Sequence, residues 1–233
     1  MKKYLWLVCL TLLLSCVKES ERKYYQSLDF YTMRSSGSLT LLEKFKTYQQ
    51  TTGVTCGPSC ALMVLDYFGQ LKGYDEMKLK ALRGTSQDTT YLRHLLNIFD
   101  AVDGVDYVST FDYERKDITP ALFLDFLRKG IPVIIGTNEW GGHWQIIIGY
   151  DTMGTETTQD DVLILADPYD RTDHHKDGYI VYPFENLYEG LWRNYYDPDF
   201  DWGLFVAVFP DGVSLLPAQQ PVGKEIILEK VEA

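Results

Sequence analysis

Residues 132–150 have the sequence PVIIGTNEWGGHWQIIIGY, in which two apolar runs flank a turn-forming segment. The runs at 132–137 and 143–150 have the length and the β-branched content of buried strands. The segment between them, 138–142, contains an asparagine and two glycines and is typical of a hairpin turn. We therefore predict an antiparallel pair of strands at this point of the chain.

The sequence on either side of this hairpin predicts an α+β fold. Downstream, three more apolar runs have the length of strands, at 162–166, 179–182 and 204–209. Upstream, apolar residues recur at helical spacing, and proline and glycine mark several helix ends, which predicts helices at 57–68, 74–82, 91–99 and 120–128. Helices followed by strands with short connections are typical of helices packed on an antiparallel sheet.

The composition of the 233-residue chain fits a folded protein of one domain. Apolar residues make up 45%, so the chain can bury a sizeable core and whole-chain disorder is excluded. Asp and Glu outnumber Lys and Arg by 33 to 22, which gives a net charge of −11. Nucleic acid is therefore not an expected partner, because phosphate binding needs a basic face. Four cysteines without a C-x-x-C pair argue against a disulfide scaffold and a zinc site.

The first sixteen residues have the features of an export signal. Two lysines precede an apolar stretch at 4–14 that is too short to span a bilayer as a helix. The ending LLSC at 13–16 resembles the lipobox of bacterial lipoproteins. This resemblance implies cleavage before Cys16, lipid on its thiol and a place in the cell envelope, at the outer membrane because Val17 follows. A buried N-terminal strand is the alternative interpretation.

These features divide the chain into four predicted segments. We expect a signal peptide at 1–15, a lipidated cysteine with a tether and lead-in at 16–44, one folded domain at 45–212 and a tail at 213–233. Within the domain, residues 170–202 form an acidic and aromatic insert. The predicted membrane contact is the lipid anchor alone.

Cys56 is the candidate nucleophile, because it stands at the start of the first predicted helix. Unpaired N–H groups and a partial positive charge at a helix N-terminus stabilise a thiolate. Gln50, six residues earlier, can fold back and donate its amide to an oxyanion beside the sulfur. Gln49 is an alternative donor, because the sequence does not decide which of two neighbouring loop residues faces the sulfur. Cys60 is interpreted as a buried helix thiol, since a disulfide with Cys56 within one helix would be strained.

A thiol nucleophile needs a base, and the base needs an orienting group. Of the four histidines, His143 has the most suitable position, at the start of a buried strand after two glycines. Asp167 ends the next strand, and neighbouring antiparallel strands bring such ends close together, so its carboxylate can accept from the second ring nitrogen of His143. Asp151 is the second choice, because it follows the strand of His143 and would have to turn back.

Three blocks that contain these residues resemble the papain-like cysteine peptidases of the C39 (bacteriocin-leader peptidase) and C39-like group. The blocks are Gln50 with TCGPSCA at 55–61, GHWQIIIGY at 142–150 and ADP at 166–168. The resemblance extends over residues 45–210 and implies a papain-like fold, with Cys56 as nucleophile, His143 as base, Asp167 as orienting residue and Gln50 as oxyanion donor. It implies hydrolysis of a peptide or amide bond in a peptide or protein substrate, with no metal or organic cofactor.

Other functions fit the same residues. Transfer of an acyl or peptide group, or cleavage of a cell-wall amide, would use the same chemistry with a different acceptor or substrate. A lipoprotein that binds without turnover is a further interpretation, favoured by the insert at 170–202. Metal binding by His174 and His175 with nearby aspartates, or calcium binding by the acidic loop 197–203, is less favoured than a solvated loop.

Overall fold

A computed structural model of the protein describes residues 28–171, 173, 175–193, 197–198, 202–213 and 215. The predicted signal peptide at 1–15, the lipidation site Cys16 and most of the predicted tail lie outside these residues. Among the described helices, none combines the length and the apolar character needed to cross a bilayer.

An antiparallel sheet forms the centre of the fold. Its main strands are β2 (Val105–Ser109), β3 (Val133–Thr137), β4 (His143–Asp151), β5 (Val162–Ala166), β6 (Tyr179–Pro183) and β7 (Phe205–Pro210). They lie side by side in the order β2-β7-β3-β4-β5-β6. β3 and β4 form the predicted hairpin, with Thr137 opposite His143. Both strands are buried along nearly their whole length, as expected in the middle of a sheet.

A short strand from the predicted lead-in also joins the sheet. β1 (Leu39–Leu41) pairs with the second half of β4, where Leu41 lies opposite Gly149. That half is available because β3 pairs with β4 only as far as Ile147. A Cβ atom at Gly149 would lie 2.8 Å from Leu41 Cδ1, so glycine permits the close approach of β1.

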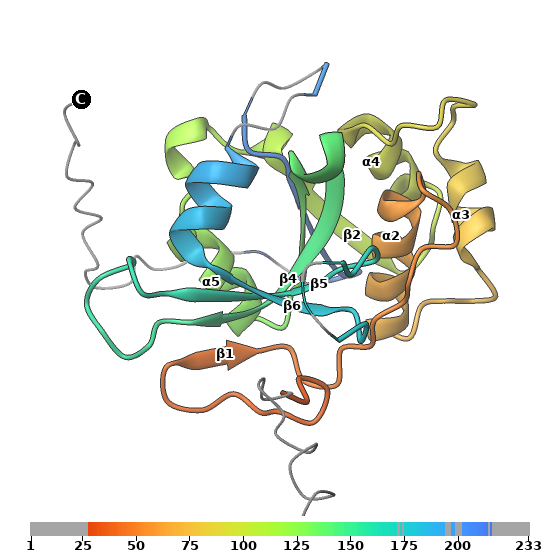
Figure 1. The fold of residues 1–233 in the computed structure, drawn as a ribbon. Helices are drawn as coiled ribbons and strands as arrows, with labels where there is room; N and C mark the ends of the chain where they lie inside the picture. The colour runs from red at the N-terminus through yellow and green to blue at the C-terminus, as the bar shows by residue number, and fades with distance from the viewer. Residues whose placement is uncertain are drawn as a thin grey trace, which may run out of the picture.

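Helices pack on the sheet from different sides (Figure 1). They are α2 (Cys56–Tyr67), α3 (Glu76–Leu82), α4 (Leu92–Asp100) and α5 (Pro120–Arg128). Figure 1 shows α2, α3 and α4 gathered at one side of the sheet and α5 at the other. Each begins and ends within two residues of its predicted bounds. Helices on an antiparallel sheet confirm the predicted α+β class.

Apart from short 3₁₀ turns, the sequence patterns did not predict β1, β2 and a helix with π-type hydrogen bonding, η4 (Asn186–Trp192). β2 is an edge strand whose middle is partly exposed, so its apolar pattern is weak. η4 lies in the acidic and aromatic insert. It is anchored by Trp192, which is buried and donates its indole N–H to the Leu204 carbonyl at 2.8 Å. These elements depend on contacts with distant parts of the chain.

Candidate active site

Cys56 is the first residue of α2 and is partly exposed to solvent. The first turn of α2 contains no acidic residue that would neutralise the positive end of the helix. Cys56 and Cys60 are both free thiols. Cys60 is fully buried and donates to the Trp144 carbonyl at 3.2 Å, and burial raises the pKa of its thiol well above the usual value. The two thiols therefore differ in access, as predicted.

His143 and Asp167 lie together at neighbouring strand ends. His143 Nε2 is 2.6 Å from Asp167 Oδ1, and the two residues are 3% and 0% exposed. Because an ionised carboxylate only accepts hydrogen bonds, Nε2 carries the proton. The Cys56 side chain also raises the pKa of His143, and Nδ1 is the ring nitrogen that is left to face it. The imidazole thus lies between the sulfur and the carboxylate.

The charge on His143 is stabilised by both of these neighbours. Burial lowers the pKa of His143, but the hydrogen bonds and charges of Asp167 and Cys56 outweigh this effect and raise it from 6.5 to about 10. An imidazole with this pKa keeps its proton at neutral pH when the adjacent sulfur is ionised. The arrangement therefore favours a protonated imidazole beside the sulfur.

Asp167, rather than Asp151, is the carboxylate beside His143. Its Oδ1 also accepts from the Tyr169 N–H at 2.7 Å, and its Oδ2 accepts from Gln145 Nε2 at 3.0 Å. Asp151 stands at the opposite end of β4 from His143 and accepts from a backbone N–H of its own turn at 2.8 Å. The alternative that placed Asp151 in this position is therefore not supported.

The backbone of Gln50 pairs with the residue after Asp167, since its N–H donates to the Pro168 carbonyl, but its side chain is bonded within its own loop. Its amide Nε2 donates to the Thr52 carbonyl at 2.7 Å, and its buried Oε1 has no hydrogen-bond partner among the described residues. Gln49 is engaged on both sides, since it donates to the Asp167 carbonyl at 3.0 Å and accepts from the Asp170 N–H at 3.3 Å. Gln49 therefore holds the loop after Asp167, while the oxyanion role of Gln50 stays a prediction.

A buried carboxylate, Glu76, holds the loop between Gln50 and Cys56. Its two oxygens accept from the Thr51 N–H at 3.0 and 3.1 Å, and Oε1 also accepts from the Ser59 hydroxyl at 3.1 Å. Burial acts to raise the pKa of Glu76, but these hydrogen bonds lower it below the usual value of 4.5. In the sequence, Glu76 has no feature that separates it from an ordinary acidic residue in the first turn of a helix.

Thr90 supports the start of α2 from the loop before α4. Its hydroxyl accepts from the buried Arg83 Nη1 at 2.8 Å, and its carbonyl accepts from the Trp144 indole at 2.7 Å. A Cβ atom at Gly57 would lie only 2.7 Å from Thr90 Cγ2. The glycine after Cys56 therefore permits a close contact that fixes the helix start against the core.

We expect Gly57→Ala to lower the free energy of unfolding by about 1–3 kcal/mol, because the added methyl group must displace Thr90. Gly53→Ala is the matched control: no atom lies within 4 Å of a Cβ there. Its expected effect is within about 0.5 kcal/mol. Urea denaturation followed by tryptophan fluorescence measures both variants, and equal effects of the two would mean that Thr90 moves aside freely.

Aromatic side chains lie beside His143. The Tyr169 ring is 6.3 Å from the His143 ring, and the Trp140 ring is 5.9 Å from Tyr169, both in edge-to-face contact. Trp140 is 63% exposed and has a φ of +53°, which is uncommon for a residue other than glycine. The structure places Trp144 in the core and Trp140 at the surface beside the site.

The weaker metal-binding interpretations concern the insert. Within the described residues, no group of three or more His, Cys, Asp and Glu side chains is arranged to hold a metal ion, and His174 lies outside them. The acidic loop 197–203 is described only in part. There Asp197 is buried and accepts from the Leu92 N–H at 2.9 Å, which ties the insert to α4.

Comparison with known proteins identifies the family. The model of the Peptidase_C39 like family matches residues 42–198. Similar solved structures include the peptidase domain of Streptococcus ComA, a bifunctional ABC transporter involved in a quorum-sensing pathway, with 17% identity, a TM-score of 0.43, and coverage of 71% of this chain and 97% of that one. A double-glycine-motif protease from an AMS/PCAT transporter, in complex with the leader peptide, has 17% identity, a TM-score of 0.44, and coverage of 70% and 90%. No curated protein sequence matches. Since the family match spans more than half of the chain, the chain belongs to the Peptidase_C39 like family.

Proposed function

We propose that this protein is a cysteine peptidase that hydrolyses a peptide or amide bond with Cys56 as its nucleophile. One observation carries the proposal: a partly exposed thiol stands at a helix start, His143 is hydrogen-bonded to Asp167, and Cys56 and Asp167 together raise the pKa of His143. Membership of a peptidase family supports the same chemistry.

In the first half of the proposed reaction, the Cys56 thiolate attacks the carbonyl carbon and the carbonyl oxygen becomes an oxyanion. The backbone N–H of Cys56, at a helix start where no intrahelical acceptor exists, would donate to this oxygen. Gln50 would be the second donor once its amide leaves the Thr52 carbonyl. His143 then gives its proton to the leaving amine as the C–N bond breaks, and a thioester remains.

In the second half, water attacks the thioester. The neutral His143 takes a proton from the water, the C–S bond breaks, and a carboxylic acid leaves as the thiolate–imidazolium pair forms again. Asp167 keeps Nε2 protonated throughout, so that Nδ1 stays directed at the sulfur. These steps use groups of this protein and water.

We also propose that the lipid predicted on Cys16 anchors this enzyme in the bacterial cell envelope, at the outer membrane. The support is the sequence pattern of residues 1–16, which lies outside the described residues. The proposed substrate is a peptide or protein that reaches this compartment.

Alkylation by iodoacetamide tests the thiol chemistry without a known substrate. At about pH 6 we expect Cys56 to react at least about tenfold faster than glutathione, because an ordinary thiol with a pKa of about 8.5 is mostly neutral there. His143→Ala should remove this excess rate. Peptide mass spectrometry should find the label on Cys56 and not on the buried Cys60. A Cys56 that reacts no faster than glutathione would contradict the proposal.

A further inference from the structure

Gln145 interrupts the apolar run of β4, and its side chain is fully buried between two carboxylates. Its Nε2 donates to Asp167 Oδ2 at 3.0 Å and to Glu139 Oε2 at 2.9 Å. Its Oε1 accepts from the Thr137 hydroxyl at 3.4 Å. Every polar atom of this amide is therefore in use, which is the expected condition for a buried polar side chain that has a defined role.

Gln145 acts on the same carboxylate as His143. The two residues are two positions apart on β4, so their side chains point to the same face of the sheet. His143 occupies Oδ1 of Asp167 and Gln145 occupies Oδ2. With the Tyr169 N–H also on Oδ1, the carboxylate cannot rotate without losing a hydrogen bond. The amide of Gln145 thus helps to fix the plane of the group that orients the imidazole.

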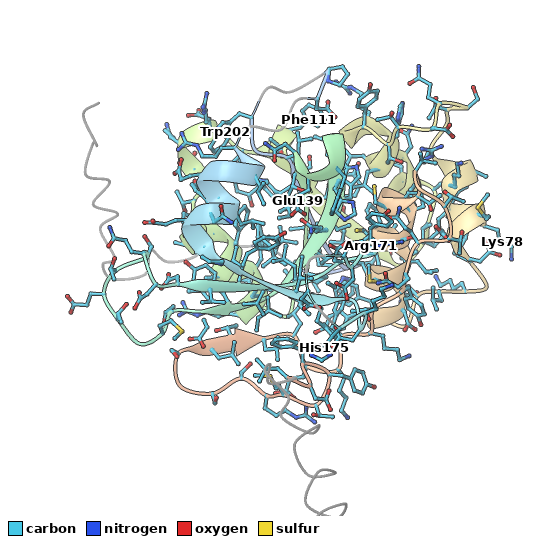
Figure 2. All side chains as sticks on the ribbon, in the orientation of Figure 1. Lys78, Phe111, Glu139, Arg171, His175 and Trp202 are labelled. Carbon is cyan, nitrogen blue, oxygen red and sulfur yellow. The ribbon has the colours of Figure 1, made fainter. Side chains whose placement is uncertain are left out.

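Glu139 extends this network to the turn between β3 and β4. Its Oε1 accepts from the Tyr182 hydroxyl of β6, and its Oε2 accepts from Gln145. In the view of Figure 2, Glu139 lies toward the middle of the molecule rather than at its outline. Glu139 directly precedes Trp140, the exposed residue with a positive φ beside the site. The turn that carries Trp140 is therefore tied to the amide that holds Asp167.

An uncharged donor is well suited to this position. Asp167 and Glu139 carry like charges, which repel most strongly where water is excluded. The amide of Gln145 donates to both and adds no charge of its own. A leucine of similar size could not donate, and a carboxylate there would add a third negative charge.

We propose that Gln145 is a positioning residue of this peptidase, which holds the Asp167 carboxylate in line with His143 and ties it to the turn of Glu139. It acts through Asp167 and not on the reacting atoms. The inference rests on the proposed function, because the alignment matters only if the imidazole and the sulfur form an ion pair.

The test is the pH profile of Cys56 alkylation by iodoacetamide in Gln145→Leu. At about pH 6 the thiolate exists only as a partner of the imidazolium, so a less well oriented Asp167 should slow alkylation about tenfold. At about pH 9.5 an ordinary thiol is ionised without help, and the variant and the wild type should react at similar rates. A substitution that only disturbed the conformation around Cys56 would instead change the alkylation rate by the same factor at every pH.

Two further variants complete the experiment. Gln159→Leu makes the same substitution at an exposed position in the loop between β4 and β5, and it should leave the profile unchanged. Tyr182→Phe removes only the hydroxyl at the far end of the network and keeps the ring, so it remains informative if Gln145→Leu does not fold. We expect a loss of about threefold at acidic pH that disappears at alkaline pH.

The outcomes separate this inference from the function on which it rests. Fast alkylation of wild-type Cys56 at acidic pH, with unchanged profiles in Gln145→Leu and Tyr182→Phe, would overturn the role of Gln145 and leave the proposed function intact. A slowing that is equal at all pH values would also overturn it. Slow alkylation of the wild type at acidic pH would overturn both.

Discussion

Cys56→Ala is expected to reduce peptide hydrolysis by at least about 10⁴-fold while changing the free energy of unfolding by less than about 1 kcal/mol. The substitution removes the proposed nucleophile and leaves the helix start, the buried imidazole and the carboxylate in place. Because Cys56 is partly exposed, loss of its sulfur removes little packing. Cleavage of a mixed-sequence peptide library, followed by mass spectrometry, measures the rate, and urea denaturation measures the stability.

Cys60→Ala is the matched control and should give the opposite pattern. Its sulfur is fully buried and donates to the Trp144 carbonyl, so its removal leaves a small cavity and loses this hydrogen bond. We expect the free energy of unfolding to fall by about 1–3 kcal/mol and the cleavage rate to stay within about threefold of wild type. Wild-type cleavage by Cys56→Ala, or loss of cleavage only in Cys60→Ala, would contradict the assignment of the nucleophile.

Glu76→Ala is expected to lower the free energy of unfolding by about 3 kcal/mol at neutral pH. Glu76 is 7% exposed, and its removal leaves the Thr51 N–H and the Ser59 hydroxyl without their charged acceptor. The loop from Gln50 to Cys56 should loosen as a result. Glu156→Ala, at an exposed loop position, serves as the control and should change stability by less than about 0.5 kcal/mol. Equal effects of the two substitutions would mean that Glu76 does not hold this loop.

The contribution of Glu76 should also depend on pH in a defined direction. Burial acts to raise the pKa of Glu76, but its hydrogen bonds have the larger, opposite effect. The pKa in the folded protein therefore lies below the usual value of 4.5, and the carboxylate stays ionised to a lower pH. The contribution is therefore complete above the pKa of the unfolded chain and is lost as pH falls through the lowered pKa of the folded state. Glu76→Gln, which does not titrate, should lose less stability than wild type between about pH 5 and pH 3. A steeper acid-induced loss in Glu76→Gln would contradict this account.

The helices and the central strands could be predicted because their signals are local. Pro120 marks the start of α5, and the glycine-containing turn before His143 separates two apolar runs that pair as β3 and β4. The meeting of His143 and Asp167 also followed from such signals, because adjacent antiparallel strands bring their ends together. β1 and η4 have no comparable pattern and depend on what they pack against.

A role near the site could be predicted only for residues that stand out from their neighbours in the sequence. Gln145 had a usable signal, since it is a polar residue within an apolar strand and shares a face with His143. Glu76 had none, because an acidic residue in the first turn of α3 is usual and its burial arises from contacts with a different helix and loop. The direction of the Gln50 amide was likewise not accessible, since a loop side chain can reach several acceptors.

The amino-acid sequence by itself indicated the side chains that we propose for the chemistry and the elements that hold them: a thiol at a helix start, an imidazole at the start of a strand and a carboxylate at the end of the next. Only the tertiary structure decided that Nε2 of His143 faces Asp167, that Gln49 holds the loop after Asp167, and that Gln145 joins two carboxylates. The reason is that helices and strands follow from patterns between near neighbours. The partners of a buried polar group are instead set by strand register and packing between segments far apart in the chain.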